Sequence, residues 1–157
     1  MLKVRIIPCL DIIKNKVVKG VNFKNIKVLG DPVHLARKYS DNGADELCML
    51  DIKASHEKRK TFLKTVEAIA KVIDIPLTVG GGVSDIKDIT TLLNAGADKV
   101  SINTTAVLNP NLIKISSLKH GSQCIVVAID GKRYGKKMLV TIKGGRERTN
   151  KTVVSWA

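Results

Sequence analysis

Acidic and amide side chains and a glycine run stand where short apolar runs of this sequence end. They are Asp11, Asp51, Gly80-Gly81-Gly82, Asn103-Thr104 and Asp130. Two aspartates suit general acid–base work, because one can stay ionised while burial or a nearby phosphate raises the pKa of the other. A glycine run lets the backbone approach a phosphate, and a helix behind it adds the positive end of its dipole. The residues predict proton transfer on a phosphorylated substrate.

Asp11 and Asp130 share a small–aliphatic–Asp context, in Cys9-Leu10-Asp11 and Ala128-Ile129-Asp130. We expect this pair to be catalytic, since opposed carboxylates fit a reaction in which a proton leaves one face of a substrate and another arrives at the other face. The alternative is that each aspartate only caps the loop after its strand. For Asp51 we expect that simpler role.

Phosphate binding is predicted at Gly81 and Gly82, with Asn103 and Thr104 as further donors from the neighbouring strand end. A tight structural turn is the alternative for the glycine run. Lys19 lies in a long first connection, where an ammonium group could clamp a phosphate as the loop closes. An ordinary solvated lysine explains its position almost as well.

The elements that must position these residues alternate between strands and helices, which is typical of a parallel α/β fold. Strands are predicted at Val4–Asp11, Glu46–Asp51, Pro76–Val79, Lys99–Ile102 and Cys124–Ile129. Helices are predicted from the Asp31 cap to near Gly43, from about His56 to Ile73, from the Ser84 cap to about Asn94, and at Pro110–Lys119. Ile12–Gly30 is too long for an ordinary connection and is expected to be an active-site loop. A Lys- and Gly-rich hairpin follows the fifth strand, and a fifth helix starts near Val153.

An internal echo indicates how these units repeat. Gly43-Ala44-Asp45 returns as Gly96-Ala97-Asp98, two strand–helix units later. Five strands and four helices predict the N-terminal half of a (β/α)8 TIM-type barrel, because a complete barrel needs about 200 residues or more. We therefore expect 1–157 to be a single half-barrel domain truncated at the start of its fifth helix.

The net charge of +13 raises the alternative of a basic nucleic-acid-binding module. Lysine outnumbers arginine and aromatic residues make up only 3%, so base reading and base stacking are poorly supplied. We expect no nucleic-acid partner; tight, strongly salt-dependent binding to DNA or RNA would support that alternative. No apolar run reaches membrane-spanning length and the start lacks a signal-peptide layout, so we expect a cytoplasmic protein without a membrane partner.

The remaining reactive residue types suggest no further site. Cys9, Cys48 and Cys124 are far apart in the sequence and are expected to be reduced, buried thiols. His34, His56 and His120 fall on predicted helices or their ends, away from the strand ends. We therefore expect no metal site and no nucleophile–base pair.

At the opposite end of the strands, Arg5, Glu46 and Lys99 stand at strand starts. Charges that converge on a core are costly unless they are paired, so the three should form a mutually neutralising ring. Such a ring could stabilise the lower end of the barrel or gate a passage through it.

Several strings together resemble the cyclase subunit of imidazole glycerol phosphate synthase, from histidine biosynthesis, along the whole of Met1 to Ala157. The strings are Ile7-Pro8-Cys9-Leu10-Asp11, Lys16-Val17-Val18-Lys19-Gly20, Gly30-Asp31-Pro32, Leu50-Asp51-Ile52, Thr78-Val79-Gly80-Gly81-Gly82, Ala97-Asp98-Lys99-Val100-Ser101-Ile102-Asn103 and Gly121-Ser122-Gln123-Cys124-Ile125-Val126-Val127-Ala128-Ile129-Asp130. The resemblance implies a lyase-type cyclisation without metal or cofactor. In it, ammonia attacks a phosphoribulosyl-formimino aminoimidazole carboxamide ribonucleotide, giving imidazole glycerol phosphate and the aminoimidazole carboxamide ribotide.

The resemblance also implies roles for individual residues. Those matching Asp11 and Asp130 are the acid–base pair, and those matching Gly82, Asn103 and Thr104 hold one substrate phosphate, with Lys19 on a mobile loop above. Arg5, Glu46 and Lys99 match a charged gate through which ammonia enters from a glutamine amidotransferase subunit, and Asp98 matches a position at that interface.

Departures from the family pattern fall in loops, where Lys53 replaces a usual threonine and Asn15 a frequent glycine. The sister isomerase of the same pathway is the enzymatic alternative, since it shares the two-phosphate, two-aspartate plan. Because a half-barrel lacks the second phosphate site, we expect the 157-residue chain alone to be inactive.

Overall fold

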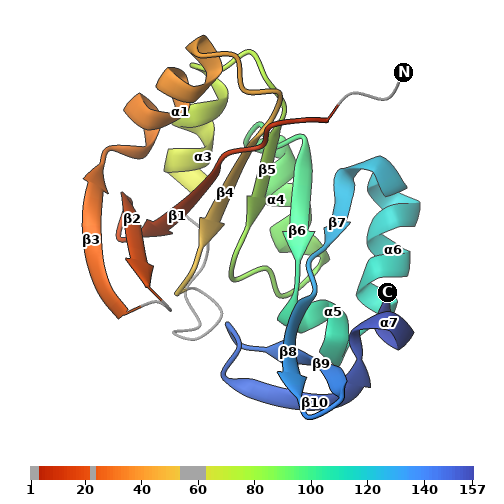
Figure 1. Cartoon of the computed structure of the whole chain (residues 1–157). Coiled ribbons are helices and arrows are strands. Elements are labelled where there is room, and N and C mark those ends of the chain that lie inside the picture. Colours follow the sequence, from red (N-terminus) through yellow and green to blue (C-terminus); the bar gives the residue numbers. More distant parts are fainter. Residues whose placement is uncertain (1–3, 22–23, 54–62) are drawn as a thin grey trace.

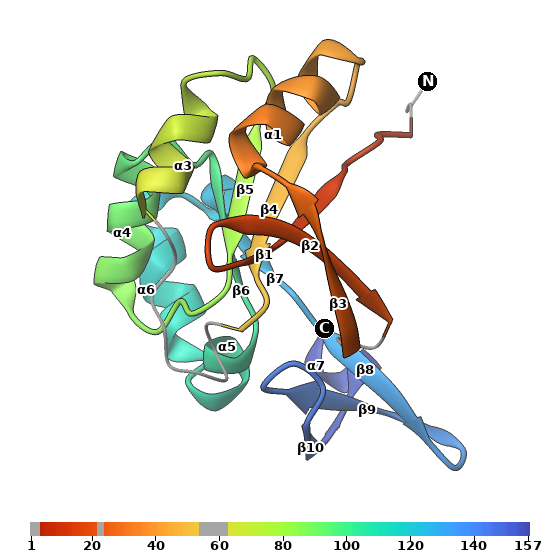
Figure 2. The same ribbon diagram turned by 90° about the vertical axis from the view of Figure 1, so that its left-hand side faces the viewer.

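A seven-stranded sheet with helices on one side forms the body of the molecule (Figures 1 and 2). The computed structural model describes residues 4–21, 24–53 and 63–157. Five strands of the sheet run parallel, in the order β1-β4-β5-β6-β7. They are β1 Cys9–Ile13, β4 Leu47–Asp51, β5 Leu77–Gly80, β6 Lys99–Ile102 and β7 Ile125–Val127. The prediction of an α/β fold with a mostly parallel sheet, as in TIM-type domains, is confirmed.

Helices connect these strands and pack on one face of the sheet (Figure 2). They are α1 Pro32–Asp41, α3 Leu63–Ala70, α4 Ile86–Asn94, α5 Thr104–Leu108 and α6 Asn111–His120, with a 3-10 turn, η1, at Ser122–Cys124. A further helix, α7 Val153–Trp156, follows the last strand and packs against the antiparallel strands described below. As predicted, Asp31 caps α1 by accepting from the backbone N–H groups of Val33 and His34, both at 3.0 Å. For α4 the predicted cap was wrong, because Asp85 rather than Ser84 accepts from the first turn. The predicted start of the second helix, near His56, lies outside the described residues.

The hydrophobic core lies between the parallel strands and the helices. Alternate strand residues such as Ile12, Met49 and Ile102 point into it and are at most 2% exposed. Ile69 of α3 and Ile89 of α4 meet them from the helix side and are fully buried. Since strand side chains alternate between faces, the residues in between lie on the face without helices.

The connection after β1 is not the irregular loop that its length predicted. It forms two antiparallel strands, β2 Lys16–Val21 and β3 Lys24–Gly30, that continue the sheet as β1-β2-β3. Lys14 and Asn15, with φ of 48° and 56°, make the two-residue turn between β1 and β2. The two strands twist away from the parallel part of the sheet (Figure 2).

The Lys- and Gly-rich segment forms a separate three-stranded antiparallel sheet, in the order β10-β9-β8. Its strands are β8 Asp130–Tyr134, β9 Lys137–Ile142 and β10 Glu147–Thr152. The predicted hairpin is confirmed, but its third strand was not foreseen. Val140 and Ile142 of β9 pack with Val107 of α5 in a small core of their own. This packing holds the sheet beyond the lower ends of β6 and β7 (Figure 1).

The echo between the two Gly-Ala-Asp strings has a structural counterpart. Asp45 donates its backbone N–H to Ile6 O and accepts from Ile6 N–H with its carboxylate. Asp98 makes the same pair of bonds to Leu77, at 2.9 and 2.8 Å. Each aspartate thus fastens the start of one strand to its parallel neighbour.

Among the described residues, none of the helices has the length and apolar character that crossing a membrane would require.

Candidate active site

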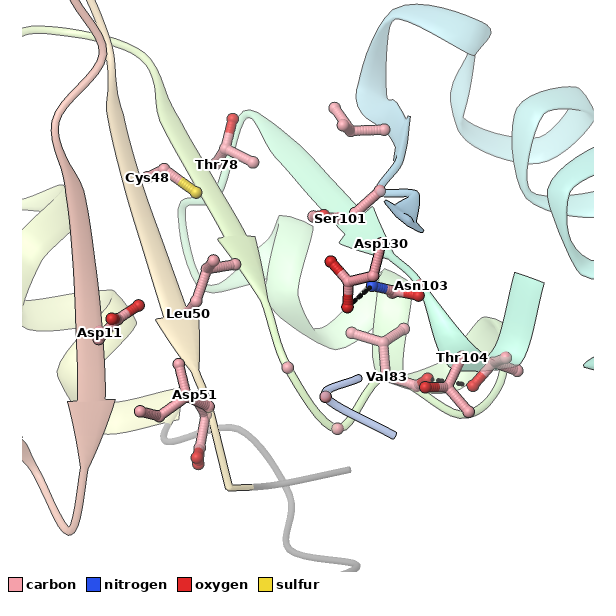
Figure 3. A pocket seen from close by; sticks show the side chains of 17 residues that line it. Asp11, Cys48, Leu50, Asp51, Thr78, Val83, Ser101, Asn103, Thr104 and Asp130 are labelled. Atoms are coloured by element: carbon pink, nitrogen blue, oxygen red, sulfur yellow. Dashed lines mark hydrogen bonds between the residues drawn. The ribbon is translucent and has the colours of Figure 1, made fainter. Parts of the chain in front are cut away.

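A cavity of about 380 Å³ opens at the C-terminal ends of the parallel strands (Figure 3). Its walls hold six of the residues singled out from the sequence, which are Asp11, Gly81, Gly82, Asn103, Thr104 and Asp130. Parallel strands gather their carboxyl ends and following loops at one edge, which explains why residues so distant in sequence meet there. Six of the residues selected from the sequence therefore lie around one cavity.

The two aspartates lie on opposite sides of the cavity. Asp11 projects from β1 on one wall and Asp130 from the start of β8 on the other, with their carboxylates directed toward the space between (Figure 3). Burial raises the pKa of Asp11 above its ordinary value, and the charge of Lys19 acts in the opposite direction with a smaller effect. Asp11 therefore keeps its proton to higher pH than an exposed carboxyl group would.

Asp130 does not end the fifth parallel strand, as predicted, but opens the antiparallel sheet. β7 ends at Val127, and Asp130 is the first residue of β8, where it pairs with Thr141 of β9. Its side chain is exposed and accepts a hydrogen bond from Asn103 Nδ2 at 3.0 Å. The chain turns between the two sheets just before Asp130, and this turn brings the carboxylate to the cavity wall.

The glycine run forms a turn that admits no side chain. Gly81 has a φ of +96°, and a Cβ there would lie 2.3 Å from the backbone oxygen of Asp51. Asp51 is itself 3% exposed and accepts from Lys53 N–H at 3.1 Å, in agreement with the predicted capping role. Gly81 and Gly82 line the cavity without side chains of their own, so a ligand can approach their backbone closely.

Backbone N–H groups at the start of α4, the helix behind the glycines, already have a carboxylate partner. Asp85 accepts from the N–H groups of Lys87 and Asp88 at the start of α4, and Asp88 accepts in turn from Ser84. A carboxylate in that position competes with any further anion. The contribution of the α4 dipole to phosphate binding stays a prediction, and the predicted side-chain polar groups beside the glycines come from the end of β6.

The end of β6 presents those polar groups. Within the described part of the chain, Asn103 makes no side-chain cap to α5, and its buried Oδ1 has no partner. Thr104 Oγ1 accepts from Lys143 N–H at 2.9 Å, which leaves its hydroxyl hydrogen able to donate. The pair can thus offer a ligand both an acceptor and a donor.

Comparison with known proteins now identifies the family. The family model described as "Histidine biosynthesis protein" matches residues 5–157. The chain belongs to the histidine biosynthesis protein family.

Curated relatives within this family carry the name imidazole glycerol phosphate synthase subunit HisF. The HisF of Prochlorococcus marinus strain MIT 9215 is 54% identical over 160 residues, covering 100% of this chain and 62% of that protein. The HisF of Campylobacter concisus is 55% identical over 153 residues, covering 98% of this chain and 61% of that protein. The predicted resemblance to the cyclase subunit is confirmed, and the chain spans about 62% of the length of the first of these relatives.

The three charged residues at the other end of the parallel strands of this chain lie together, as predicted. Glu46 is 5% exposed and accepts from both Arg5 and Lys99, the latter at 2.6 Å. Lys99 starts β6 while Glu46 precedes β4, so the pair reaches across β5. Asp98 lies beside this group, and its carboxylate is bonded to Leu77 N–H. The three charges neutralise one another in part, which explains how a buried carboxylate is tolerated.

Lys19 is the one predicted phosphate ligand that does not line the cavity. Lys19 is exposed on β2 and pairs with Lys27 of β3. It follows Val18, which is the β2 partner of Asp11. Its charge nevertheless acts on the Asp11 carboxyl group. In this arrangement Lys19 stands beside the cavity, on a strand rather than on an irregular loop.

Sequence reasoning missed several residues of the cavity wall. Cys48 and Ser101 each lie two positions before a wall residue, and Thr78 is the register partner of Cys48 on the next strand, so strand alternation could have found them. Gly144 reaches the wall from the turn between β9 and β10, for which no local signal existed. Of the histidines, His34 is exposed on α1, and His120 bonds Thr90 Oγ1 at 3.0 Å on the helix side. His56 lies outside the described residues.

No group of three or more His, Cys, Asp or Glu side chains within residues 4–21, 24–53 and 63–157 is arranged to hold a metal ion.

Proposed function

We propose that this chain is the N-terminal half-barrel of an imidazole glycerol phosphate synthase cyclase subunit, a single domain over residues 1–157. The enzyme would use ammonia from a glutamine amidotransferase subunit to convert phosphoribulosyl-formimino aminoimidazole carboxamide ribonucleotide. The products would be imidazole glycerol phosphate and the aminoimidazole carboxamide ribotide. The observation that carries the proposal is one cavity that is lined by two opposed aspartates and by a glycine turn. The names of the relatives support the choice of reaction.

In this proposal Asp11 and Asp130 move the protons of the cyclisation. Asp11 would act as the general acid, because burial raises its pKa. Asp130, which accepts from Asn103, is then the base on the opposite side of the substrate. Opposed placement lets one group take a proton while the other returns one, without rotation of the substrate.

One substrate phosphate would bind between the glycine turn and the end of β6. Gly81 and Gly82 let the phosphate approach the backbone, and Asn103 and Thr104 supply side-chain contacts. Lys19 would approach this phosphate or the substrate from β2. Arg5, Glu46 and Lys99 would form the ammonia entrance at the opposite end of the strands, with Asp98 at the partner interface.

A hybrid enzyme tests this proposal. It joins residues 1–157 to the C-terminal remainder of the Prochlorococcus marinus relative, and turnover is measured with ammonium salts in place of the amidotransferase. We expect cyclisation by the hybrid, no turnover by the 157-residue chain alone, and losses of about 10²–10⁴-fold for Asp11→Asn and Asp130→Asn. Asp41→Asn, at the exposed end of α1, is the matched control and should retain activity.

Two results would count against the assignment. Isomerisation of the phosphoribosyl-formimino precursor without ammonium-dependent cyclisation would favour the sister isomerase. Full activity in the Asp11→Asn and Asp130→Asn hybrids would remove the acid–base roles.

A further inference from the structure

Two cysteines that are distant in the sequence lie side by side on the face of the sheet without helices. Cys9 of β1 and Cys48 of β4 are direct partners in the parallel register. Neighbouring strands lie about 4.8 Å apart, which falls inside the range of Cα separations that a disulfide spans. The prediction of buried thiols was wrong for Cys9, which is exposed, whereas Cys48 and Cys124 are half-buried. Strand register brings Cys9 and Cys48 together despite their distance in the sequence.

The two thiols also influence each other's ionisation. Their side-chain interaction lowers the pKa of Cys9 and raises that of Cys48. Burial and the charge of Asp11 act in the opposite sense on Cys9 and only partly offset the effect. Cys9 is exposed whereas Cys48 is half-buried, so the thiol that ionises more readily is also the more accessible one.

We propose that Cys9 and Cys48 form a peroxide-reactive dithiol site that closes to a disulfide between β1 and β4. The Cys9 thiolate attacks hydrogen peroxide, so that an S–O bond forms, the O–O bond breaks and hydroxide leaves. Cys9 is then a sulfenic acid, oxidised by two electrons. The Cys48 sulfur attacks Cys9, an S–S bond forms, the S–O bond breaks, and the hydroxide released takes the Cys48 proton as water. In total, two thiols and one peroxide give one disulfide and two waters.

The position of the pair gives the reaction a structural consequence. Cys9 stands two residues before Asp11 on the same face of β1, and Cys48 lines the cavity directly. A disulfide would thus change the cavity wall next to the carboxyl group. The inference stands on register and exposure and does not depend on which reaction the cavity performs.

Peptide mapping of the 157-residue chain tests the proposal. Trypsin separates the three cysteines into the peptides 6–14, 39–53 and 120–132. The chain is treated with hydrogen peroxide, the remaining thiols are alkylated with iodoacetamide, and the digest is analysed by mass spectrometry. We expect peptides 6–14 and 39–53 to be joined, and to separate after dithiothreitol. Peptide 120–132 should stay alkylated, with Cys124 losing its thiol at least about tenfold more slowly than Cys9.

Two variants sharpen the result. Cys124→Ser should still form the link, whereas Cys48→Ser should leave Cys9 as a sulfenic acid that dimedone traps. Mapping the unaltered chain needs neither variant, so a folding defect in one of them leaves the test intact. Recovery of 6–14 and 39–53 as separate alkylated or overoxidised peptides would overturn the proposal. So would a link that forms only between molecules, seen as dimers on a non-reducing gel.

Discussion

Asn103 donates a hydrogen bond from Nδ2 to Asp130 Oδ2 over 3.0 Å, and so joins the end of β6 to the start of β8. The same asparagine belongs to the proposed phosphate contacts. A change at Asn103 should therefore affect both substrate binding and proton transfer, which distinguishes it from its neighbour Thr104.

The first prediction separates these two effects in the hybrid enzyme. Asn103→Leu removes the donor that orients Asp130, so we expect kcat to fall roughly 10-fold or more and KM to rise. Thr104→Val removes only a ligand contact and should raise KM with a smaller effect on kcat. Steady-state kinetics of both variants decide the point; equal kcat values in the two variants would show that Asn103 does not act through Asp130.

The second prediction concerns the glycine turn. Gly81→Ala forces a left-handed conformation on alanine and drives its Cβ against the Asp51 backbone, so it should cost roughly 2–4 kcal/mol of unfolding free energy. Gly135→Ala, in a turn where a Cβ meets nothing within 4 Å, is the matched control and should cost about 1 kcal/mol. Urea unfolding of the 157-residue chain measures both. Similar costs at the two positions would contradict the close packing at Gly81.

The third prediction uses the repeated aspartates. Asp45→Ala and Asp98→Ala each remove one carboxylate bond to a strand N–H, and each should cost about 1 kcal/mol. The two bonds tie different pairs of strands, so the double variant should cost the sum within about 0.5 kcal/mol. Urea unfolding of the three variants checks this. A strongly non-additive result would mean that the two positions are coupled through the sheet.

The fourth prediction concerns the buried carboxylate of Glu46. Glu46→Leu leaves Arg5 and Lys99 without their shared partner and should cost roughly 2–4 kcal/mol. Adding Lys99→Met removes one of the stranded charges, so the double variant should be less destabilised than the two single costs combined. A double-mutant cycle by urea unfolding measures this coupling. A coupling energy near zero would show that the 2.6 Å contact contributes little.

The fifth prediction is a pH dependence at Asp11. Burial raises the pKa of this group in the folded chain above its ordinary value of 3.8, so the folded state holds the proton more tightly than the unfolded state does. The contribution of Asp11 to stability is therefore lost as pH rises through the folded pKa. Asp11→Asn avoids this loss, so it should raise Tm at neutral pH and show no gain below pH 3.8.

Thermal unfolding between pH 3 and pH 7 provides the measurement, with the exposed Asp41→Asn as the comparison. A Tm gain of Asp11→Asn that stays the same at all pH values would contradict an effect of ionisation.

Much of the parallel sheet could be predicted, because local signals mark its units. The predicted strand at Lys99–Ile102 is observed with the same bounds, since a segment with buried Val100 and Ile102 at alternate positions follows the Gly-Ala-Asp string. The strand-end positions of Asp11 and Asn103 followed from the same signals, and this is why six cavity residues could be chosen in advance.

The misses share a physical cause, which is that they depend on non-local pairing. Lys14-Asn15 makes a left-handed turn although it lacks the glycine that usually signals one, so β2 and β3 were taken for a loop. Asp130 was predicted to end a parallel strand, whereas it starts β8. The pairing of β8 with β9 is stabilised by packing of β9 against α5, which the local sequence does not reveal. The pairing of Cys9 with Cys48 depends on strand register, which neither segment reveals alone.

Alternate residues along β1 and β4 face opposite sides of the sheet, so that one set packs in the core and the other lines the cavity. Leu10, Ile12 and Met49 stabilise the fold from one side of the backbone, while Asp11 and Cys48 line the cavity on the other. Selection can therefore replace the reactive side chains without touching the packing that keeps the protein folded. Inserting or deleting a single residue within these strands would instead exchange the two sets and destroy both at once.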